Sequence, residues 1–409
     1  MRRLGVRSTI LSCYTGYITQ AIINNFAPLL FLTFQSDYGI SLTLIGTMIT
    51  VNFGVQLLVD LLATKYADAI GYRKCLVIAH ILCGTGLILL ALLPNVLPIP
   101  VIGLFVASAL YAIGGGLIEV LVSPVIEACP TQNKKAAMSL LHSFYCWGQV
   151  SVVAISTLFF VLAGVQNWMI LACIWAVVPL LNAVLFMFVP IHRLVREGEN
   201  PIKIRELLQG RTFWLCVILM ICAGSSEIAI GQWASAFAES GLKVSKTVGD
   251  LLGPCLFAVC MGISRVMFSV IGGKIDLKKA LTVASVGCVG GYLLCALAPQ
   301  SQAWLGLVGC GVVGLFVAIM WPGIFSYATE RIPKGGTALF ALLALAGDLG
   351  CMSGPSMVGG VADQFGGSLS VGIGVGVIFP LLMFFVLLFT KSRQSEKETD
   401  RSVKGSQNE

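Results

Sequence analysis

Charged residues are scarce in this chain of 409 residues, because Asp, Glu, Lys and Arg together make up only 11% of it. Soluble domains carry about 25% charged residues, since their surfaces must face water. A chain with so small a share cannot cover a globule of this size with polar side chains. The scarcity therefore excludes an ordinary soluble domain and predicts a surface that faces lipid.

Motifs of enzymes and of metal or nucleotide sites are missing as well. The three histidines form no H-E-x-x-H pattern, and the chain has neither a G-x-S-x-G elbow nor a Walker loop. The 14 cysteines form no CxxC pair and lie mostly in apolar runs, which is typical of small core residues. The net charge of +7 is spread over short loops rather than gathered in one basic patch. These absences favour a protein that is not an enzyme and has no cofactor, metal site or nucleic-acid partner.

Long apolar runs fill the chain instead, with 57% hydrophobic residues, 45 glycines and a mean hydropathy of +0.91. A helix needs about 20 apolar residues to cross the hydrocarbon core of a bilayer. The first run is too long for a signal peptide and lacks an A-x-A cleavage site, so it is predicted to remain as a membrane span. Twelve such spans are expected, near residues 8–34, 42–66, 74–94, 98–126, 137–163, 167–190, 212–237, 247–272, 279–298, 303–328, 337–361 and 369–390.

The distribution of basic residues tests this count. Cytoplasmic segments of membrane proteins are enriched in Lys and Arg. With the N-terminus inside, every basic residue except Lys243, Lys246 and Arg265 falls in a cytoplasmic segment. If one span had been miscounted, the basic residues after it would fall in external rather than cytoplasmic segments. The pattern predicts a multi-pass protein of the plasma or inner membrane with both termini in the cytoplasm.

The loop after the second span combines an acid, a glycine turn and two cations, at Asp68, Gly71, Arg73 and Lys74. The corresponding loop of the second half keeps Gly272, Asp276 and the trailing cations. Both resemble the conserved loop of the major facilitator superfamily. The resemblance implies an all-α membrane fold of twelve helices in two pseudo-symmetric six-helix bundles, which alternate between conformations. Asp68, Gly71, Arg73, Lys74 and Asp276 would then form a conformational latch on the cytoplasmic side.

The loop at 191–211 is the longest internal connection and is rich in charged residues. We therefore expect an N-terminal bundle at 1–190, a cytoplasmic linker at 191–211 and a C-terminal bundle at 212–390. The charged tail at 391–409 is expected to be disordered and cytoplasmic. Repeated halves around a site near the middle of the membrane are typical of secondary transporters.

Ionisable side chains inside spans are costly, so each is a candidate functional residue. Glu119 follows three consecutive glycines in the fourth span and precedes Ser123 and Pro124. This segment resembles the L-E-x-x-x-N-P motif of the fucose permease-like sugar:proton symporters, with Ser123 in place of the asparagine. The resemblance implies that Glu119 couples protons or contacts substrate, and a structural acid is the alternative.

The first and seventh spans resemble the same symporters. Asn24, Asn25 and Pro28 are similar to the family's N-D-x-x-x-P region, with Asn25 where the family has an aspartate. Paired amides suit hydroxyl-rich ligands, although they also pack helices together. Glu227 precedes Gln232 and Trp233, as a glutamate precedes a tryptophan in the family's seventh helix. A ring face and an amide could line a carbohydrate site, whereas a terminal tryptophan is also a common interface anchor.

Further polar residues complete the expected site. Asp348, between Gly347 and Gly350, is predicted to couple protons together with Glu119 and Glu227. Arg265 could pair with Asp348 or Glu227, bind an anionic substrate, or reach the cytoplasmic face. Asp60 is interpreted as a structural residue near the loop that follows the second span. Candidate substrate-binding residues also include His142, Gln149 and Trp321.

The sequence thus predicts a secondary active transporter of a small polar solute, most simply a sugar, driven by a proton gradient and acting as a monomer in the bilayer. An exporter of amphipathic compounds and a uniporter are the alternatives. A channel is less consistent with the repeated halves. The identity of the solute and the direction of transport are not determined by the sequence.

Overall fold

The computed structural model describes residues 5–130, 134–191, 204–271, 276–332 and 336–390, and it contains only helices and their connections over these ranges. Short turns of 3-10 or π-helix (η) join some of the α-helices. The helices that form the body of the protein are α1 (Val6–Asn25), α2 (Phe31–Tyr38), α3 (Leu42–Ile70), α4 (Tyr72–Val96), α5 (Pro100–Ala128), α6 (Lys134–Ala163), α7 (Trp168–Phe188), α8 (Ile204–Gln209), α9 (Arg211–Ala236), α10 (Lys246–Asp250), α11 (Leu256–Ile271), α12 (Leu277–Leu297), α13 (Ala303–Val317), α14 (Met320–Arg331), α15 (Gly336–Gln364), α16 (Leu369–Gly376) and α17 (Ile378–Leu388).

Eleven helical segments of the described chain are long and apolar enough to cross a membrane. They match eleven of the predicted spans to within a few residues. The remaining predicted span, 337–361, corresponds to α15, which is 29 residues long and packs between α9 and α3. The predicted all-α fold class is confirmed.

Several spans are built from two helices rather than one, and proline explains where they break. Proline lacks a backbone N–H and clashes with the preceding helical turn. Pro28 lies at the start of the 3-10 turn η1 (Ala27–Leu30), which separates α1 from α2. Pro254 lies in η4 (Leu251–Cys255), which joins α10 to α11. These breaks occur inside single spans and do not change the order of the membrane crossings.

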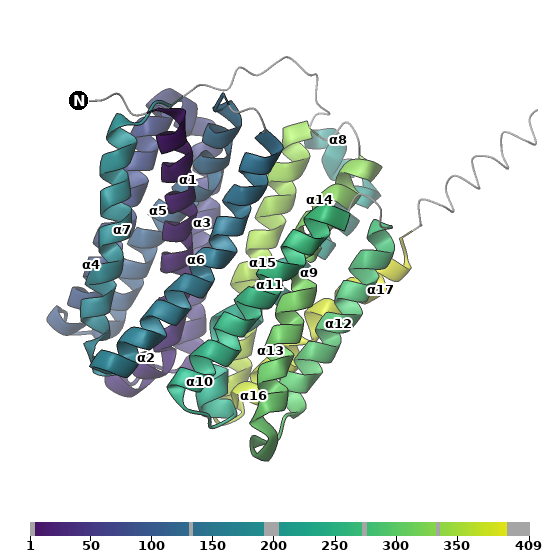
Figure 1. Cartoon of the computed structure of the whole chain (residues 1–409). Helices are drawn as coiled ribbons and strands as arrows, with labels where there is room; N and C mark the ends of the chain where they lie inside the picture. Colours follow the sequence, from purple (N-terminus) through teal and green to yellow (C-terminus); the bar gives the residue numbers. More distant parts are fainter. Residues whose placement is uncertain (1–4, 131–133, 192–203, 272–275, 333–335, 391–409) are drawn as a thin grey trace, which may run out of the picture.

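The helices form two groups that stand side by side, α1 to α7 in one and α9 to α17 in the other (Figure 1). We call the end of the molecule where α1 begins the terminal face and the opposite end the far face. The start of α1 and the end of α7 meet at the terminal face, where the Thr9 hydroxyl donates to the Pro190 carbonyl over 2.7 Å. The linker at 192–203 and the tail at 391–409 lie outside the described residues, so the predicted domain boundaries stay a prediction.

The two groups contact one another closely toward the far face, chiefly through α3 and α15. A Cβ atom added to Gly46 would lie 3.2 Å from the Ser356 Cα, so a larger residue here would push the two helices slightly apart. One turn further along α3, the Thr50 hydroxyl contacts the Ser356 hydroxyl. Small residues of this kind let membrane helices pack backbone to backbone.

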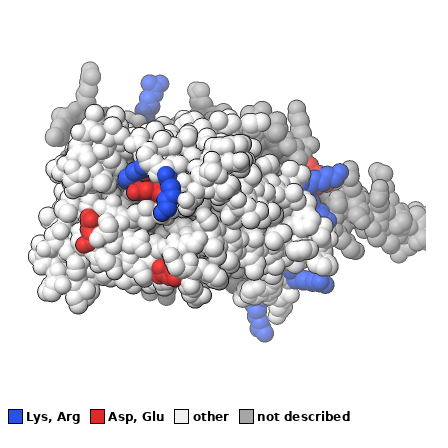
Figure 2. All heavy atoms as spheres, turned by 90° about the horizontal axis from the view of Figure 1, so that it is seen from below, with Lys and Arg blue, Asp and Glu red and all other residues white. Residues whose placement is uncertain are grey.

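A charged contact also joins the groups at the far face. The Lys246 ammonium donates to the Leu29 carbonyl over 2.5 Å and lies 3.3 Å from the Asp250 carboxylate and 3.9 Å from that of Glu239. Viewed from this end, charged side chains are few, and acidic and basic ones meet in one cluster (Figure 2). The far face of the molecule is therefore held closed in this conformation.

Candidate functional site

A chain of amide side chains runs between α1 and α3. The Asn24 side-chain oxygen accepts hydrogen bonds from Asn52 and Gln56 over 3.2 Å each. The Gln56 oxygen in turn accepts from the Gln20 amide over 2.8 Å. All four side chains are buried. Gln20 and Asn24 share one face of α1, because residues four apart in a helix lie one above the other.

Glu119 extends this chain to α5. The same Gln20 nitrogen donates to the Glu119 carboxylate over 3.0 Å. Glu119 lies about ten residues from the end of α5, which places it about 15 Å below the terminal face at the helical rise per residue. Its side chain is nevertheless exposed. Glu119 therefore faces an open space between the helices rather than a packed interior.

Two more carboxyl groups lie near Glu119. Asp60 on α3 interacts electrostatically with both Glu119 and Asp348, and Asp348 on α15 interacts with Glu119. All three lie at a similar depth, since each is about ten residues from the end of its helix at the terminal face. Asp60 and Glu119 belong to one group of helices and Asp348 to the other. The carboxyl groups thus meet across the boundary between the groups. We call Gln20, Asn24, Gln56, Asp60, Glu119 and Asp348 the polar cluster.

An ion pair also lies at the boundary between the two groups. The Arg265 guanidinium on α11 is 3.3 Å from the Glu227 carboxylate on α9. It also lies 3.5 Å from the Cys146 thiol on α6, in the other group of helices. Of the alternatives left open by the sequence, the structure selects pairing with Glu227. The pairing neutralises both charges and leaves the carboxylates of the polar cluster without this cation.

Three expected substrate-binding residues are enclosed by protein in this conformation. The Asn25 amide donates to the Ala21 carbonyl over 2.9 Å, within its own helix. The Gln232 amide donates to the Asn24 carbonyl over 2.9 Å and so joins α9 to α1. The Trp233 ring is fully buried, and its N–H donates to the Pro355 carbonyl over 2.9 Å. These contacts place Gln232 and Trp233 in the closed packing toward the far face.

The remaining candidates lie on either side of the boundary between the two groups. His142 on α6 is exposed and its ring is 5.4 Å from the Tyr17 ring, whereas Gln149 on the same helix is buried. Trp321 on α14 is half-buried and packs directly on Gly347, next to Asp348. The structure therefore brings Trp321 close to the polar cluster.

The expected latch residues have distinct surroundings at the terminal face. Gly71 joins α3 to α4 with a φ of +95°, a backbone conformation that favours glycine. The Arg73 guanidinium donates to the Phe186 and Met187 carbonyls over 2.8 and 2.7 Å, which closes the end of α7. Lys74 is exposed. Asp276 caps α12 by accepting from the Lys279 amide over 3.0 Å. The side chain of Asp68 lies outside what the structure describes.

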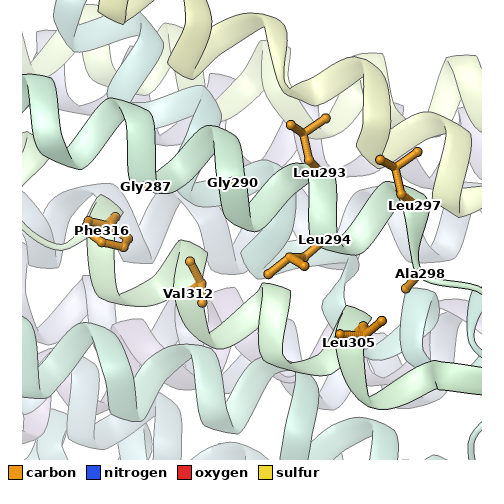
Figure 3. A pocket seen from close by; sticks show the side chains of 9 residues that line it. All are labelled: Gly287, Gly290, Leu293, Leu294, Leu297, Ala298, Leu305, Val312 and Phe316. Carbon is orange, nitrogen blue, oxygen red and sulfur yellow. The ribbon is translucent and has the colours of Figure 1, made fainter.

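A separate cavity of about 560 Å³ lies between α12 and α13 (Figure 3). Its lining consists of apolar side chains and glycines, including Leu293, Leu297, Leu305 and Phe316. Such a lining offers no group that could orient a polar solute. The cavity is therefore not part of the candidate site.

Sequence reasoning missed Gln20 and Gln56 and interpreted Asp60 as a structural residue near Asp68. In the structure the Asp60 charge interacts with Glu119 and Asp348, while the side chain of Asp68 lies outside the described residues. One signal was available: Gln20 with Asn24, and Gln56 with Asp60, are four residues apart and share a helix face. A polar stripe of this kind inside an apolar span faces protein or water rather than lipid.

A bundle of apolar helices in two groups, with carboxylates and amides at their boundary, defines an integral membrane protein of the transporter class. The model of the Major Facilitator Superfamily matches residues 11–355, and the chain belongs to this family. Transporters of this family are not enzymes as a class.

Relatives and solved structures agree with this placement. The membrane protein MosC of Rhizobium meliloti is 22% identical over 374 residues, which cover 89% of this chain and 86% of that protein. The crystal structure of the nucleoside transporter NupG matches with a TM-score of 0.76 and 11% identity, covering 94% of this chain and 99% of the other. The D-xylose-proton symporter matches with a TM-score of 0.73 and 16% identity, covering 93% and 96%. At these identities the solved structures show the shared fold alone.

Proposed function

We propose that this transporter is a proton-coupled symporter of a small hydroxyl-rich solute, a sugar or sugar derivative. The solute would bind at the polar cluster between the two groups of helices. One observation supports this most directly: Glu119 is exposed at mid-depth and is joined through Gln20 to a chain of amides. A carboxyl group in that position can take up a proton, and the amides that are hydrogen-bonded to it can rearrange in response.

The amide chain supports a hydroxyl-rich solute. Amide groups both donate and accept hydrogen bonds, as hydroxyl groups do, so Gln20, Asn24 and Gln56 can exchange their mutual bonds for bonds to a polyol. One of the solved neighbours named above is a nucleoside transporter, and the other is a D-xylose-proton symporter. An exporter of amphipathic compounds would be better served by an aromatic cavity, and Trp233 is enclosed by protein. A uniporter is the main alternative, because Asn25 stands where the similar symporters have an acid.

Alternating access is supported by the asymmetry between the two ends. The far face is closed by Lys246, Gln232 and the packing of α3 on α15. Glu119, in contrast, is reached by solvent. We propose that the terminal face is cytoplasmic, because the basic residues favour that orientation, and that this conformation is open inward. Glu119 would exchange its proton with the cytoplasm in this state and with the outside in the other.

Counterflow in proteoliposomes tests the proposal. Purified protein is reconstituted with unlabelled sugar inside, and uptake of labelled sugar is measured for a panel of hexoses and pentoses. The measurement is repeated with an imposed proton gradient, acidic outside. We expect exchange of at least one sugar and its accumulation only with the gradient. Exchange that the gradient never converts into accumulation would identify a uniporter, and absence of exchange for the whole panel would contradict a sugar substrate.

A further inference from the structure

The apolar cavity between α12 and α13 is a groove that opens toward the outside of the helix bundle (Figure 3). Its rim on α12 is exposed, because Leu293 and Leu297 are 43% and 75% exposed and Gly290 is exposed one turn before them. The same face of α12 continues with the exposed Val283 and Val286. In a membrane protein such an apolar face contacts the acyl chains of the bilayer. The groove is therefore continuous with the lipid-facing surface.

The groove extends along the far half of the membrane. Its lining on α12 runs from Gly287 to Ala298, and its lining on α13 runs from Phe316 to Leu305. Each stretch covers about 16 Å at the helical rise per residue. Because α12 runs from the terminal face to the far face, its stretch begins near the middle of the helix and ends at the far face (Figure 1). Half of the hydrocarbon core of a bilayer is about 15 Å thick. The groove thus has the length and direction of one acyl chain in the far leaflet.

The two helices cannot close the groove by moving together, because their backbones already touch behind it. A Cβ atom added to Gly309 would lie 2.8 Å from the Gly291 carbonyl oxygen. On the same buried side, the Cys295 and Cys310 sulfur atoms are 3.9 Å apart. On the open side, in contrast, a Cβ atom added to Gly290 would meet no described atom within 4 Å. The space on the lipid side is therefore a fixed feature of this helix pair.

The chemistry of the lining selects an uncharged, apolar occupant. The described lining consists of apolar side chains and glycines, so a water molecule would not find the two to four polar partners that it needs. A groove left empty would lose the dispersion contacts of its lining atoms. The connection at its far-face end, residues 299–304, contains no charged residue and exposes Gln300 and Gln302. These amides can donate hydrogen bonds to ester carbonyl groups.

We propose that the groove binds one acyl chain of a far-leaflet phospholipid. The end of the chain lies near Gly287 and Phe316, and its ester group lies near Gln300 and Gln302. Both helices belong to the second group, so the lipid moves with that group in every conformation. The site is thus a structural lipid site that is separate from the solute site, and it does not depend on which solute is transported.

Photo-cross-linking of the wild-type protein tests the proposal. The protein is reconstituted in dioleoyl phosphatidylcholine vesicles that contain a small fraction of phosphatidylcholine with a diazirine on one chain, placed either next to the ester or at the chain end. Labelled peptides are mapped by mass spectrometry. We expect the chain-end probe to label the residues around Gly287 and Phe316, and the ester-side probe to label those around Ala298 and Leu305. Labelling should exceed that of the exposed face of α7, around Leu181, by at least about fivefold. Labelling at the level of α7 would show ordinary surrounding lipid only and would overturn the inference.

A variant that fills the groove assigns the labelling to it. Gly290→Phe places a ring in the open space and replaces a poor helix former, so the protein should still fold. Labelling of α12 and α13 should fall by about fivefold, while labelling of α7 stays unchanged. Gly360→Phe is the matched control, because a Cβ atom added to this glycine of α15 would also meet no described atom within 4 Å.

Two results of this comparison would contradict the inference. Labelling of α12 and α13 that persists in Gly290→Phe, or that falls equally in Gly360→Phe, would show that the chain does not lie in the groove. Cross-links between two copies of the protein through α12 and α13, in place of lipid labelling, would assign the groove to a second copy. If Gly290→Phe does not fold, the positions labelled by the two probes in the wild-type protein decide the question.

Discussion

The Asp363 carboxylate at the end of α15 caps the first turn of α3, where it accepts from the Thr43 amide over 2.6 Å and from the Leu42 amide over 3.1 Å. This contact joins the two groups of helices at the far face. An anion at a helix N-terminus is stabilised by the unpaired amides and by the helix dipole. The contact therefore stabilises the conformation in which the far face is closed, and it would be broken in the conformation in which that face is open.

Asp363→Asn is expected to weaken far-face closure by about 1 kcal/mol, which shifts the balance of conformations about fivefold. Spin labels on the far-face ends of α3 and α15 would report the change as a larger share of long distances. Asp37→Asn removes an acid from the same face without touching α15 and serves as the control. Unchanged distance distributions in Asp363→Asn would show that the contact does not select the conformation.

The pH dependence of this contact follows from its hydrogen bonds. Partial burial opposes ionisation of Asp363, but the hydrogen bonds from Thr43 and Leu42 outweigh it and lower the pKa of its carboxyl. Its stabilising effect is thus fully present above about pH 4, the ordinary pKa of Asp, and is lost as the pH falls through the lowered value. The contribution of Asp363 to far-face closure should therefore not change between about pH 5 and 8. Measured in the Glu119→Gln background, which removes the proposed proton site, the difference in far-face distances with and without Asp363→Asn should be the same across this window. A difference that varies within the window would contradict the lowered pKa of Asp363.

The ion pair of Arg265 and Glu227 gives a second prediction. Removing one partner leaves the other charge in a mostly buried setting, so Glu227→Gln and Arg265→Gln should each destabilise the protein by about 2 kcal/mol. The double variant should recover part of this loss, because neither charge is then left alone. Thermal unfolding in detergent, followed by tryptophan fluorescence, measures the three midpoints. A double variant as unstable as the sum of the single ones would contradict the pairing.

A buried network in the first group of helices should affect stability but not substrate affinity. The Asn182 amide on α7 donates to the His80 ring over 2.8 Å and to the Ser12 carbonyl over 2.9 Å, and the other His80 nitrogen donates to the Leu76 carbonyl over 2.7 Å. Asn182→Leu leaves the His80 ring and the Ser12 carbonyl without this donor, so it should lower the free energy of unfolding by about 2 kcal/mol.

The expected signature is a lowered unfolding midpoint with an unchanged KM for the transported sugar. Gln302→Leu, at an exposed amide just before α13, is the matched control and should leave both values unchanged. A large rise in KM for Asn182→Leu would place this network in the transport pathway rather than in the scaffold.

Much of this architecture could be predicted from the sequence, because it depends on local composition. Span lengths follow from apolar runs, and the order of crossings follows from the basic loops. Glu119 could be singled out because a carboxyl group in an apolar run is costly wherever the helix packs. The breaks at Pro28 and Pro254 also have local causes, although they leave the span count unchanged.

The partners of each residue could not be predicted in the same way, since they depend on how helices far apart in the sequence pack together. Asp60 meets Glu119 because Gly116 lets α3 approach α5, and no local pattern specifies that approach. Arg265 had several possible partners on sequence grounds, and only the placement of α9 and α11 in the folded protein selects Glu227. Trp233 has an aromatic ring of the kind that lines sugar-binding sites, but its neighbours enclose it in this conformation.

Gradient-driven uptake by Glu119→Gln tests the central claim most directly. Glutamine keeps the shape of the side chain and its contact with Gln20 but cannot exchange a proton. The account predicts that this variant still exchanges labelled for unlabelled solute in counterflow, while a proton gradient no longer drives accumulation. Accumulation at the wild-type level in Glu119→Gln proteoliposomes would contradict the account, because the coupling proton would then bind elsewhere.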